Sequence, residues 1–358
     1  MIDKVLLFPY YAVLKLRHFL YDKGVLKSQR AEVPTICVGN ISAGGTGKTP
    51  HTEMILRELL AGGKWSDRKI AVLSRGYKRE SSGFQQVTVD GSAAAFGDEP
   101  LQIKKKFPEV AVAVDKDRIE GCRLLTHFKE IGADIIILDD AFQYRKLRAD
   151  LNIILVDYNH PLHKDHLLPL GRLRDLPERI READIIIVTK CPGYLDEKTR
   201  TDWAEGLGVK NFSTTGCCGT SAGGKRQLVL FTYMEYCPLQ PVFDISDHRY
   251  VYSKKLILFT GIAKDKPLRN YLKGSYNIVR RFGFPDHHRF TPNDFREIKF
   301  ASDKCPTAVL VTTEKDAQRV LDYKELDASL KERMFMVPIK TAFLTQEEHD
   351  IFRDELTG

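Results

Sequence analysis

The sequence predicts an α/β protein with a three-layer α/β/α domain, a second and smaller α/β domain, and an N-terminal amphipathic helix. Short apolar runs rich in β-branched residues alternate with helix-forming segments, and they do so in two separate series. Such continuous runs indicate strands that are buried on both faces, as in a parallel sheet covered by helices. The chain has 358 residues, which is ample for two domains. We expect segments at 1–27, 28–245 and 246–358.

The first two dozen residues combine aromatic and leucine side chains with basic ones. No apolar run approaches the roughly 20 residues of a transmembrane helix, and no small-residue cleavage site follows, so neither a spanning helix nor a signal peptide is expected. An amphipathic helix fits this pattern. It would either lie in a membrane interface or pack on the protein's own core, and the residues alone leave both readings open.

The first series of apolar runs supplies the strands of the larger domain. They are expected at 34–38, 69–74, 110–114, 134–139, 151–157, 184–189 and 227–233. The second series begins near residue 255 with KLILFTG and continues with YNIVRRF, TAVLVTT and MFMVPI. Because ligands gather at the carboxyl ends of parallel strands, the polar residues that follow each run are the candidates for a site.

A glycine-rich segment follows the first predicted strand and precedes a helix-forming stretch. It consists of Ser42, Ala43, Gly44, Gly45, Thr46, Gly47, Lys48 and Thr49. The glycines let successive backbone N–H groups turn towards one anion, the lysine can reach the β- and γ-phosphates, and the last threonine can offer its hydroxyl to Mg²⁺. The usual pattern begins with Gly rather than Ser, but the strand-loop-helix context favours a P-loop over a chance GKT. The segment predicts binding of a nucleoside triphosphate.

Two acids end the run DIIIL. Asp139 and Asp140 stand where a P-loop protein carries the acid that holds Mg²⁺ directly or through water. The plain alternative is an acidic pair that ends a strand and caps the next segment. We expect both acids, with Thr49, to hold the metal, and Gln143 to face the same site.

Other strand ends also carry polar groups. SRGYKR supplies Arg75 and Tyr77, GDEP supplies Asp98, and FPDHHRF supplies His287 and His288. An acid in a loop is often only a helix cap, and two adjacent histidines are often a surface pair. Zinc is not expected, because adjacent histidines in a strand point to opposite faces and no third ligand has recognisable spacing.

The net charge and the cysteine content indicate which partners and which redox compartment suit the protein. The net charge of +7 and a pI near 8.9 fit an anionic partner, without choosing among nucleotide, nucleic acid and an acidic membrane surface. The seven cysteines form no Cys-x-x-Cys pair and mostly sit among apolar residues. Reduced, buried thiols in a cytosolic or cytosol-facing protein are the expectation.

Taken in order, these segments resemble the tetraacyldisaccharide 4′-kinase family, the lipid A kinases of Gram-negative bacteria. The resemblance covers most of the chain. It rests on VGNISAGGTGKTP, VLSRGYKR, GDEPLQI, LDDAFQ, DLNIILVD, LLPLGRLRD, ADIIIVTK, FTGIAKDKPL, FPDHHRFTPNDF and VTTEKDAQRV. Ala141 and Tyr144 depart from the expected DDGFQH, and no role is carried onto them.

The resemblance implies a P-loop kinase that uses ATP and Mg²⁺ to phosphorylate the 4′-hydroxyl of a tetraacylated glucosamine disaccharide 1-phosphate in lipid A (lipopolysaccharide) biosynthesis. It implies that Lys48 and the loop amides hold the triphosphate. It further implies that Asp98 is the base, oriented by a histidine for which we prefer His287 over His288. Candidate substrate contacts are Arg75, Tyr77, Arg118, Gln143, Arg172, Arg174 and His288. For each arginine a solvated surface role is the alternative.

A substrate with four acyl chains leaves a membrane at a cost of about 0.8 kcal/mol for each buried methylene, so the enzyme must reach the lipid. The resemblance therefore favours the interfacial reading of the N-terminal helix and a peripheral position at the cytoplasmic face of the inner membrane. The expected partners are the acylated disaccharide phospholipid and the membrane surface, with no nucleic acid and no obligate protein partner.

Two alternative functions are considered for the chain. A partitioning or switch ATPase usually carries a lysine directly before the Gly-Gly pair, where this chain has Ala43. Guanine specificity would need Asn/Thr-Lys-x-Asp, which the stretch at 189–192 lacks. A soluble small-molecule kinase, with the N-terminal helix used only for packing, is the other alternative.

Overall fold

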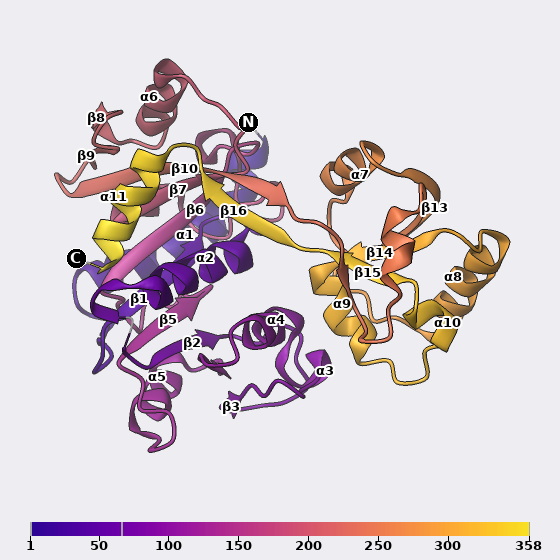
Figure 1. Cartoon of the computed structure of the whole chain (residues 1–358). Coiled ribbons are helices and arrows are strands. Elements are labelled where there is room, and N and C mark those ends of the chain that lie inside the picture. Colours follow the sequence, from indigo (N-terminus) through magenta and orange to yellow (C-terminus); the bar gives the residue numbers. More distant parts are fainter. Residues whose placement is uncertain (1, 66, 358) are drawn as a thin grey trace.

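A computed structural model of the chain describes residues 2–65 and 67–357. Within them two sheets form two bodies of unequal size (Figure 1). The larger sheet has eleven strands in the order β3-β4-β2-β5-β1-β6-β7-β10-β9-β8, and β16 also pairs with β10. The smaller has five, in the order β11-β15-β14-β12-β13. The predicted α/β class is confirmed.

The centre of the larger sheet is parallel, as its apolar runs predicted. These strands are β4 (Ala111–Val114), β2 (Ile70–Ser74), β5 (Ile135–Asp139), β1 (Thr35–Asn40), β6 (Leu151–Asp157), β7 (Ile185–Thr189) and β10 (Arg226–Tyr236). Antiparallel strands lie at the margins, namely β3 (Gln85–Gln86), β9 (Cys218–Thr220) and β8 (Lys210–Ser213). In the register of β1 with β5, Val38 lies opposite Asp139, so the first predicted strand ends beside the predicted metal acids.

Helices cover both faces of this sheet, which makes the three layers. One face packs under α2 (Lys48–Ala61), α4 (Asp98–Lys106) and α11 (Gln346–Thr357). The other packs under α1 (Ile2–Asp22), α5 (Arg118–His127) and α6 (Glu197–Gly206). Shorter elements of this body are α3 (Ala93–Phe96), η1 (Gly63–Trp65), η2 (Leu162–Lys164) and η3 (Pro177–Glu182).

The smaller body is a second α/β unit. Its strands are β11 (Gln240–Pro241), β12 (Lys255–Thr260), β13 (Asn277–Gly283), β14 (Val309–Thr313) and β15 (Met334–Val337). Its helices are η4 (His248–Tyr252), α7 (Lys266–Lys273), α8 (Pro292–Lys304), α9 (Glu314–Leu321) and α10 (Ala328–Lys331). A capping box between Thr291 and Asp294 starts α8, as the sequence T-P-N-D leads one to expect.

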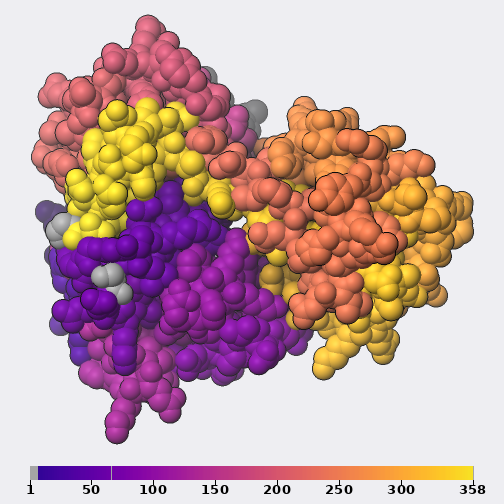
Figure 2. All heavy atoms as spheres, in the orientation of Figure 1, coloured from indigo at the N-terminus to yellow at the C-terminus, as the bar shows by residue number. Residues whose placement is uncertain are grey.

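The end of the chain returns to the larger body, which differs from the smaller domain expected over 246–358. Strand β16 (Ile339–Phe343) pairs antiparallel with the second half of β10. Helix α11 then buries Phe352 and Leu356 in the core shared with α2. Figure 2 shows this yellow segment seated on the larger body. The two bodies are therefore joined by two adjacent strands, which are tied where the Cys237 amide donates to the Pro338 carbonyl (2.9 Å).

Helix α1 packs on the protein's own core along one face and leaves apolar side chains exposed on another. Leu14 and His18 are buried against the larger body. Four apolar side chains elsewhere on the helix stay more than half exposed, namely Phe8 (66%), Val13 (63%), Leu16 (59%) and Phe19 (54%). Among the described residues, no helix combines the length and the apolar character needed to cross a bilayer. The helix is thus packed along one face and apolar on its open face.

Candidate active site

The glycine-rich loop connects β1 to α2 at the carboxyl end of the parallel strands, as predicted. Gly44 and Gly47 have φ values of 97° and 90°, which favour glycine. A Cβ on Gly44 would lie 2.9 Å from the Arg172 guanidinium, which would have to move to make room for a side chain there. The first amides of α2 lack partners within their own helix and are available to an anion.

Side chains outside the loop hold it in place. The Asn40 amide donates to Thr46 Oγ1 (2.9 Å), and the Thr189 hydroxyl donates to the Thr46 carbonyl (2.9 Å). Lys190 follows β7 and donates to the Gly45 carbonyl and to Asp157 Oδ2 (2.7 Å). Lys190 was not among the predicted site residues, although its position at a strand end was a signal for this site.

The acid pair lies beside the loop, and its two members have opposite environments. Asp139 is buried, and its Oδ2 accepts from the Ser74 hydroxyl (3.0 Å). Burial, together with the charges of Glu99 and Asp140, raises the pKa of Asp139 to about 7. Asp140 is also desolvated, but Lys48 and Arg174 outweigh that effect and hold its pKa below the ordinary value. Asp140 has a φ of 52°, which turns the chain directly after the strand.

The donors present fit a magnesium ion. Asp139 Oδ1 is buried and has no hydrogen-bond partner among the described residues. A bound cation would pair with this oxygen. Thr49 contributes a buried hydroxyl from the start of α2. In the described part of the chain no cluster of three or more His, Cys, Asp or Glu side chains is arranged to hold a metal. Mg²⁺ needs no such cage, because it usually takes one or two carboxylates together with waters and substrate phosphates.

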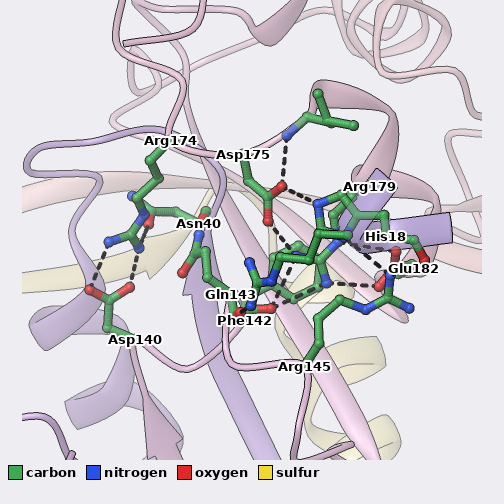
Figure 3. A network of polar contacts seen from close by, with 12 residues as sticks. His18, Asn40, Asp140, Phe142, Gln143, Arg145, Arg174, Asp175, Arg179 and Glu182 are labelled. Atoms are coloured by element: carbon green, nitrogen blue, oxygen red, sulfur yellow. Dashed lines mark hydrogen bonds and ion pairs between the residues drawn. The ribbon is translucent and has the colours of Figure 1, made fainter. Parts of the chain in front are cut away.

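Arg174 and Asp175 are chain neighbours that point in opposite directions (Figure 3). Arg174 makes a bidentate pair with Asp140 and also contacts Asn40. Asp175 is buried and accepts from His18 of α1 (2.6 Å) and from Arg179. The open-faced helix α1 is thereby joined through two adjacent residues to the predicted metal acid.

Three more predicted contacts lie around the loop. The backbone amide of Ala43 donates to the backbone carbonyl of Arg172 (2.5 Å). The side-chain amide of Gln143 donates to the backbone carbonyl of Asn40 (2.5 Å). The backbone carbonyl of Gln143 accepts from Arg17 (3.0 Å). Arg118 is buried at the start of α5, where the Asp115 carbonyl accepts from it (2.8 Å).

A second cluster forms where α4 faces α9 across the seam between the two bodies. Asp98 is buried at the start of α4, and its Oδ2 lies 3.2 Å from Nδ1 of His287, which comes from the smaller body. Desolvation of Asp98 is outweighed by the His287 hydrogen bond and by the charges of Lys315 and Arg319, so the pKa of Asp98 lies below its ordinary value. The Tyr77 ring stands edge-on to the His287 ring at 5.3 Å.

His288 faces elsewhere. Its Nε2 lies 2.8 Å from Asp294 Oδ2, and its ring stacks on Phe284 at 4.5 Å. The structure thus brings His287, and not its neighbour, to Asp98. Arg75 and Tyr77 are exposed on the loop that follows β2.

A cavity of about 180 Å³ opens beside this cluster. Its lining includes Tyr77, Lys78 and Asp98 from the larger body and His287, Arg289 and Arg319 from the smaller one. Figure 2 shows the surface hollowed along the same seam.

A protein-family model described as tetraacyldisaccharide-1-P 4′-kinase matches residues 4–357. The chain belongs to the tetraacyldisaccharide 4′-kinase family. A tetraacyldisaccharide 4′-kinase from Phocaeicola vulgatus is 38% identical over 350 residues, which are 96% of this chain and 90% of that protein. One from Flavobacterium johnsoniae is 36% identical over 349 residues, 96% of this chain and 94% of that protein.

A solved structure agrees with this assignment. A crystal structure of LpxK from Aquifex aeolicus, described as an apo form in complex with ATP, is 29% identical, has a TM-score of 0.71 and covers 100% of both chains. As a member of the tetraacyldisaccharide 4′-kinase family the chain is a kinase, which confirms the resemblance and rejects the switch ATPase.

Proposed function

We propose that the protein transfers the γ-phosphoryl group of ATP to the 4′-hydroxyl of a tetraacylated glucosamine disaccharide 1-phosphate. Family membership supports the acceptor class, and the related Aquifex aeolicus structure, described as a complex with ATP, supports the donor. The observation that carries the proposal is the contact of Asp98 with His287, a carboxylate held by an imidazole at the seam between the two bodies.

In the proposed reaction the substrate oxygen forms a bond to the γ-phosphorus while the bond from that phosphorus to the β-γ bridging oxygen breaks and ADP leaves. The hydroxyl proton passes to Asp98. The lowered pKa of Asp98 keeps it ionised at neutral pH, so it can accept a hydrogen bond from the hydroxyl and take the proton late. Such a weak base suffices because the transition state of phosphoryl transfer is loose.

On the nucleotide side, Lys48 and the loop amides neutralise the triphosphate, and Thr49, Asp139 and Asp140 would hold Mg²⁺. The ion would supply positive charge to the phosphate oxygens when bound. Arg172 lies beside Gly44 and Arg174 pairs with Asp140, and both arginines suit an anionic group of the nucleotide or the lipid.

We place the protein peripherally at the cytoplasmic face of the inner membrane. The support is the open apolar face of α1, which has the character of an interfacial helix. The same helix contacts the site region, since the Tyr10 hydroxyl donates to the Arg174 carbonyl (3.3 Å). An enzyme with this arrangement would meet a lipid acceptor at the bilayer surface.

The test is transfer of labelled γ-phosphate to the acylated disaccharide in mixed micelles, with a water-soluble glucosamine disaccharide as the competing acceptor. We expect phosphorylation of the lipid alone. Asp98→Ala should lower the rate by about 10²–10⁴-fold while nucleotide binding is kept. Equal turnover of the soluble sugar would favour the small-molecule kinase, and equal turnover by Asp98→Ala would reject the base.

A further inference from the structure

Lys315 stands at the start of α9 and faces the Asp98 cluster from the smaller body. Its Nζ lies 2.8 Å from Glu99 Oε1, 3.3 Å from His287 Nε2 and 3.9 Å from Asp98 Oδ2. In the sequence this residue belongs to the segment VTTEKDAQRV, and no role was predicted for it. It is the group that touches the far side of the imidazole that holds Asp98.

The contact between the lysine and the histidine favours one tautomer of the imidazole. An ammonium group has three donors and no acceptor, so at 3.3 Å it can donate to Nε2 of His287 only in the tautomer whose Nε2 carries no proton. The single proton of the neutral ring then sits on Nδ1, which faces Asp98 Oδ2 at 3.2 Å. The ring therefore donates to the carboxylate.

Without this cation His287 would lie among carboxylates. Asp98 and Glu99 approach from α4, Asp286 Oδ2 lies 3.9 Å from Nε2, and Tyr77 covers one edge of the ring. Nearby anions favour the charged imidazolium. Arg319 Nε, 3.7 Å from Asp98 Oδ2, is the other cation on α9 that faces the cluster. Lys315 is thus the positive group that opposes protonation of Nε2.

We propose that Lys315 is a positioning residue for the phosphoryl transfer, which keeps His287 neutral with its proton on Nδ1 and so holds the Asp98 carboxylate ready for the acceptor hydroxyl. The proposal rests on the proposed function of Asp98 as the proton acceptor. It extends the catalytic pair to a third residue, supplied by the smaller body. Docking of that body then both orients the base and sets the charge around it.

The alternative is a purely structural role, in which Lys315 only links the two bodies through its ion pair with Glu99. Another lysine at the same contact between the bodies provides a matched control for this alternative. Lys106 bridges the same two helices, with Nζ 2.8 Å from Glu53 and 2.5 Å from Glu314, and these acids rather than His287 are its ion-pair partners among the described residues. Lys106→Met therefore removes an ion pair across the seam and leaves the imidazole alone.

The experiment compares Lys315→Met, Lys315→Gln and Lys315→Arg with Lys106→Met in the full chain. Glutamine keeps an N–H donor without the charge, and arginine keeps both. We expect kcat to fall about 10–100-fold in Lys315→Met, less than for loss of the base itself, with the KM for ATP little changed. Lys315→Arg should recover most of the rate, and Lys106→Met should stay within about threefold of the native chain.

A second readout does not depend on activity. Nitrogen-15 NMR of labelled histidine, assigned with His287→Gln, should show Nδ1 protonated and Nε2 bare in the native protein at neutral pH. In Lys315→Met the Nε2 atom should become protonated. The charge of Lys315 helps to lower the pKa of Asp98, so the acidic limb of the pH-rate profile should move to higher pH in that variant.

A proton on Nε2 in the native protein would overturn the proposal. Equal losses of kcat in Lys315→Met and Lys106→Met, with an unchanged His287 tautomer, would also overturn it. That result would mean that Lys315 only holds the two bodies together. Failure of the native chain to phosphorylate the lipid would instead count against the proposed function, since the NMR result stands without it.

Discussion

The ammonium nitrogen of Lys48 lies 3.7 Å from Oδ2 of Asp140, across the carboxyl end of the parallel sheet. The first is the lysine of the glycine-rich loop and the second is a predicted metal acid. Their contact joins the two motifs that the sequence presents separately. It also shows how a cationic group and an anionic group balance each other at the place where a triphosphate and its cation are proposed to sit.

Replacing Lys48 by alanine should remove phosphoryl transfer without unfolding the chain. A positioned cation at the transferred phosphate contributes on the order of 10²–10³-fold in rate. Asp140 keeps its pair with Arg174 when Lys48 is removed, so the melting temperature should change little. The measurement is labelled phosphate transfer beside a thermal melt, and Lys129→Ala, at an exposed position, is the control. A native rate in Lys48→Ala would contradict the P-loop assignment.

The exposed face of α1 should bind lipid. We expect Val13→Asp combined with Leu16→Asp to lower the fraction of protein that sediments with anionic phospholipid vesicles by at least about tenfold, because two apolar groups no longer enter the bilayer boundary. Both side chains are more than half exposed, so folding should be kept. Tyr252→Asp, at an 86% exposed site of the smaller body, is the matched control. Unchanged sedimentation of the double variant would exclude this face.

Folding stability should fall in mild acid because of His51. This buried histidine lies within hydrogen-bonding distance of the Gly47 carbonyl (2.7 Å) and Thr232 Oγ1 (2.9 Å), and burial lowers its pKa from 6.5 to about 4. The unfolded chain therefore binds more protons between these values, and the free energy of unfolding decreases as pH falls through that window. His51 alone should account for about 2 kcal/mol between pH 7.5 and 5.

The variant His51→Asn isolates that contribution, because asparagine cannot titrate. Its deficit in unfolding free energy relative to the native chain should be largest at pH 7.5 and should shrink at pH 5. Denaturant titrations at the two pH values provide the measurement. A deficit that is the same at both would show that His51 is not the titrating group.

The returning helix α11 should be needed for the larger body. Phe352 is fully buried against α2 and the sheet, so Phe352→Ala should cost about 3–5 kcal/mol of unfolding free energy. Phe300→Ala is the matched control, because that ring is 63% exposed on the smaller body and should cost under about 0.5 kcal/mol. Similar small losses of unfolding free energy in both variants would show that α11 does not stabilise the larger body.

Local pattern was sufficient for the parallel strands and for the glycine-rich loop. The run 134–139 and strand β5, Ile135–Asp139, agree because a strand buried on both faces must be continuously apolar. Ser42 to Thr49 could be identified as a loop because the glycines and the lysine act on a phosphate through adjacent backbone, which needs no distant partner. Residues that act through their immediate neighbours can be recognised from the chain alone.

Only the tertiary structure decided which distant groups meet. The sequence contains two adjacent histidines, and the φ of 60° at His287 and the stacking of His288 on Phe284 determine which of them faces Asp98. Lys315 gains its contacts because α9 docks on α4, and β16 leaves its own unit because β10 extends past its parallel neighbour. Sheet edges and side-chain contacts of this kind depend on where two remote segments pack, and hydrophobic periodicity carries no information about that.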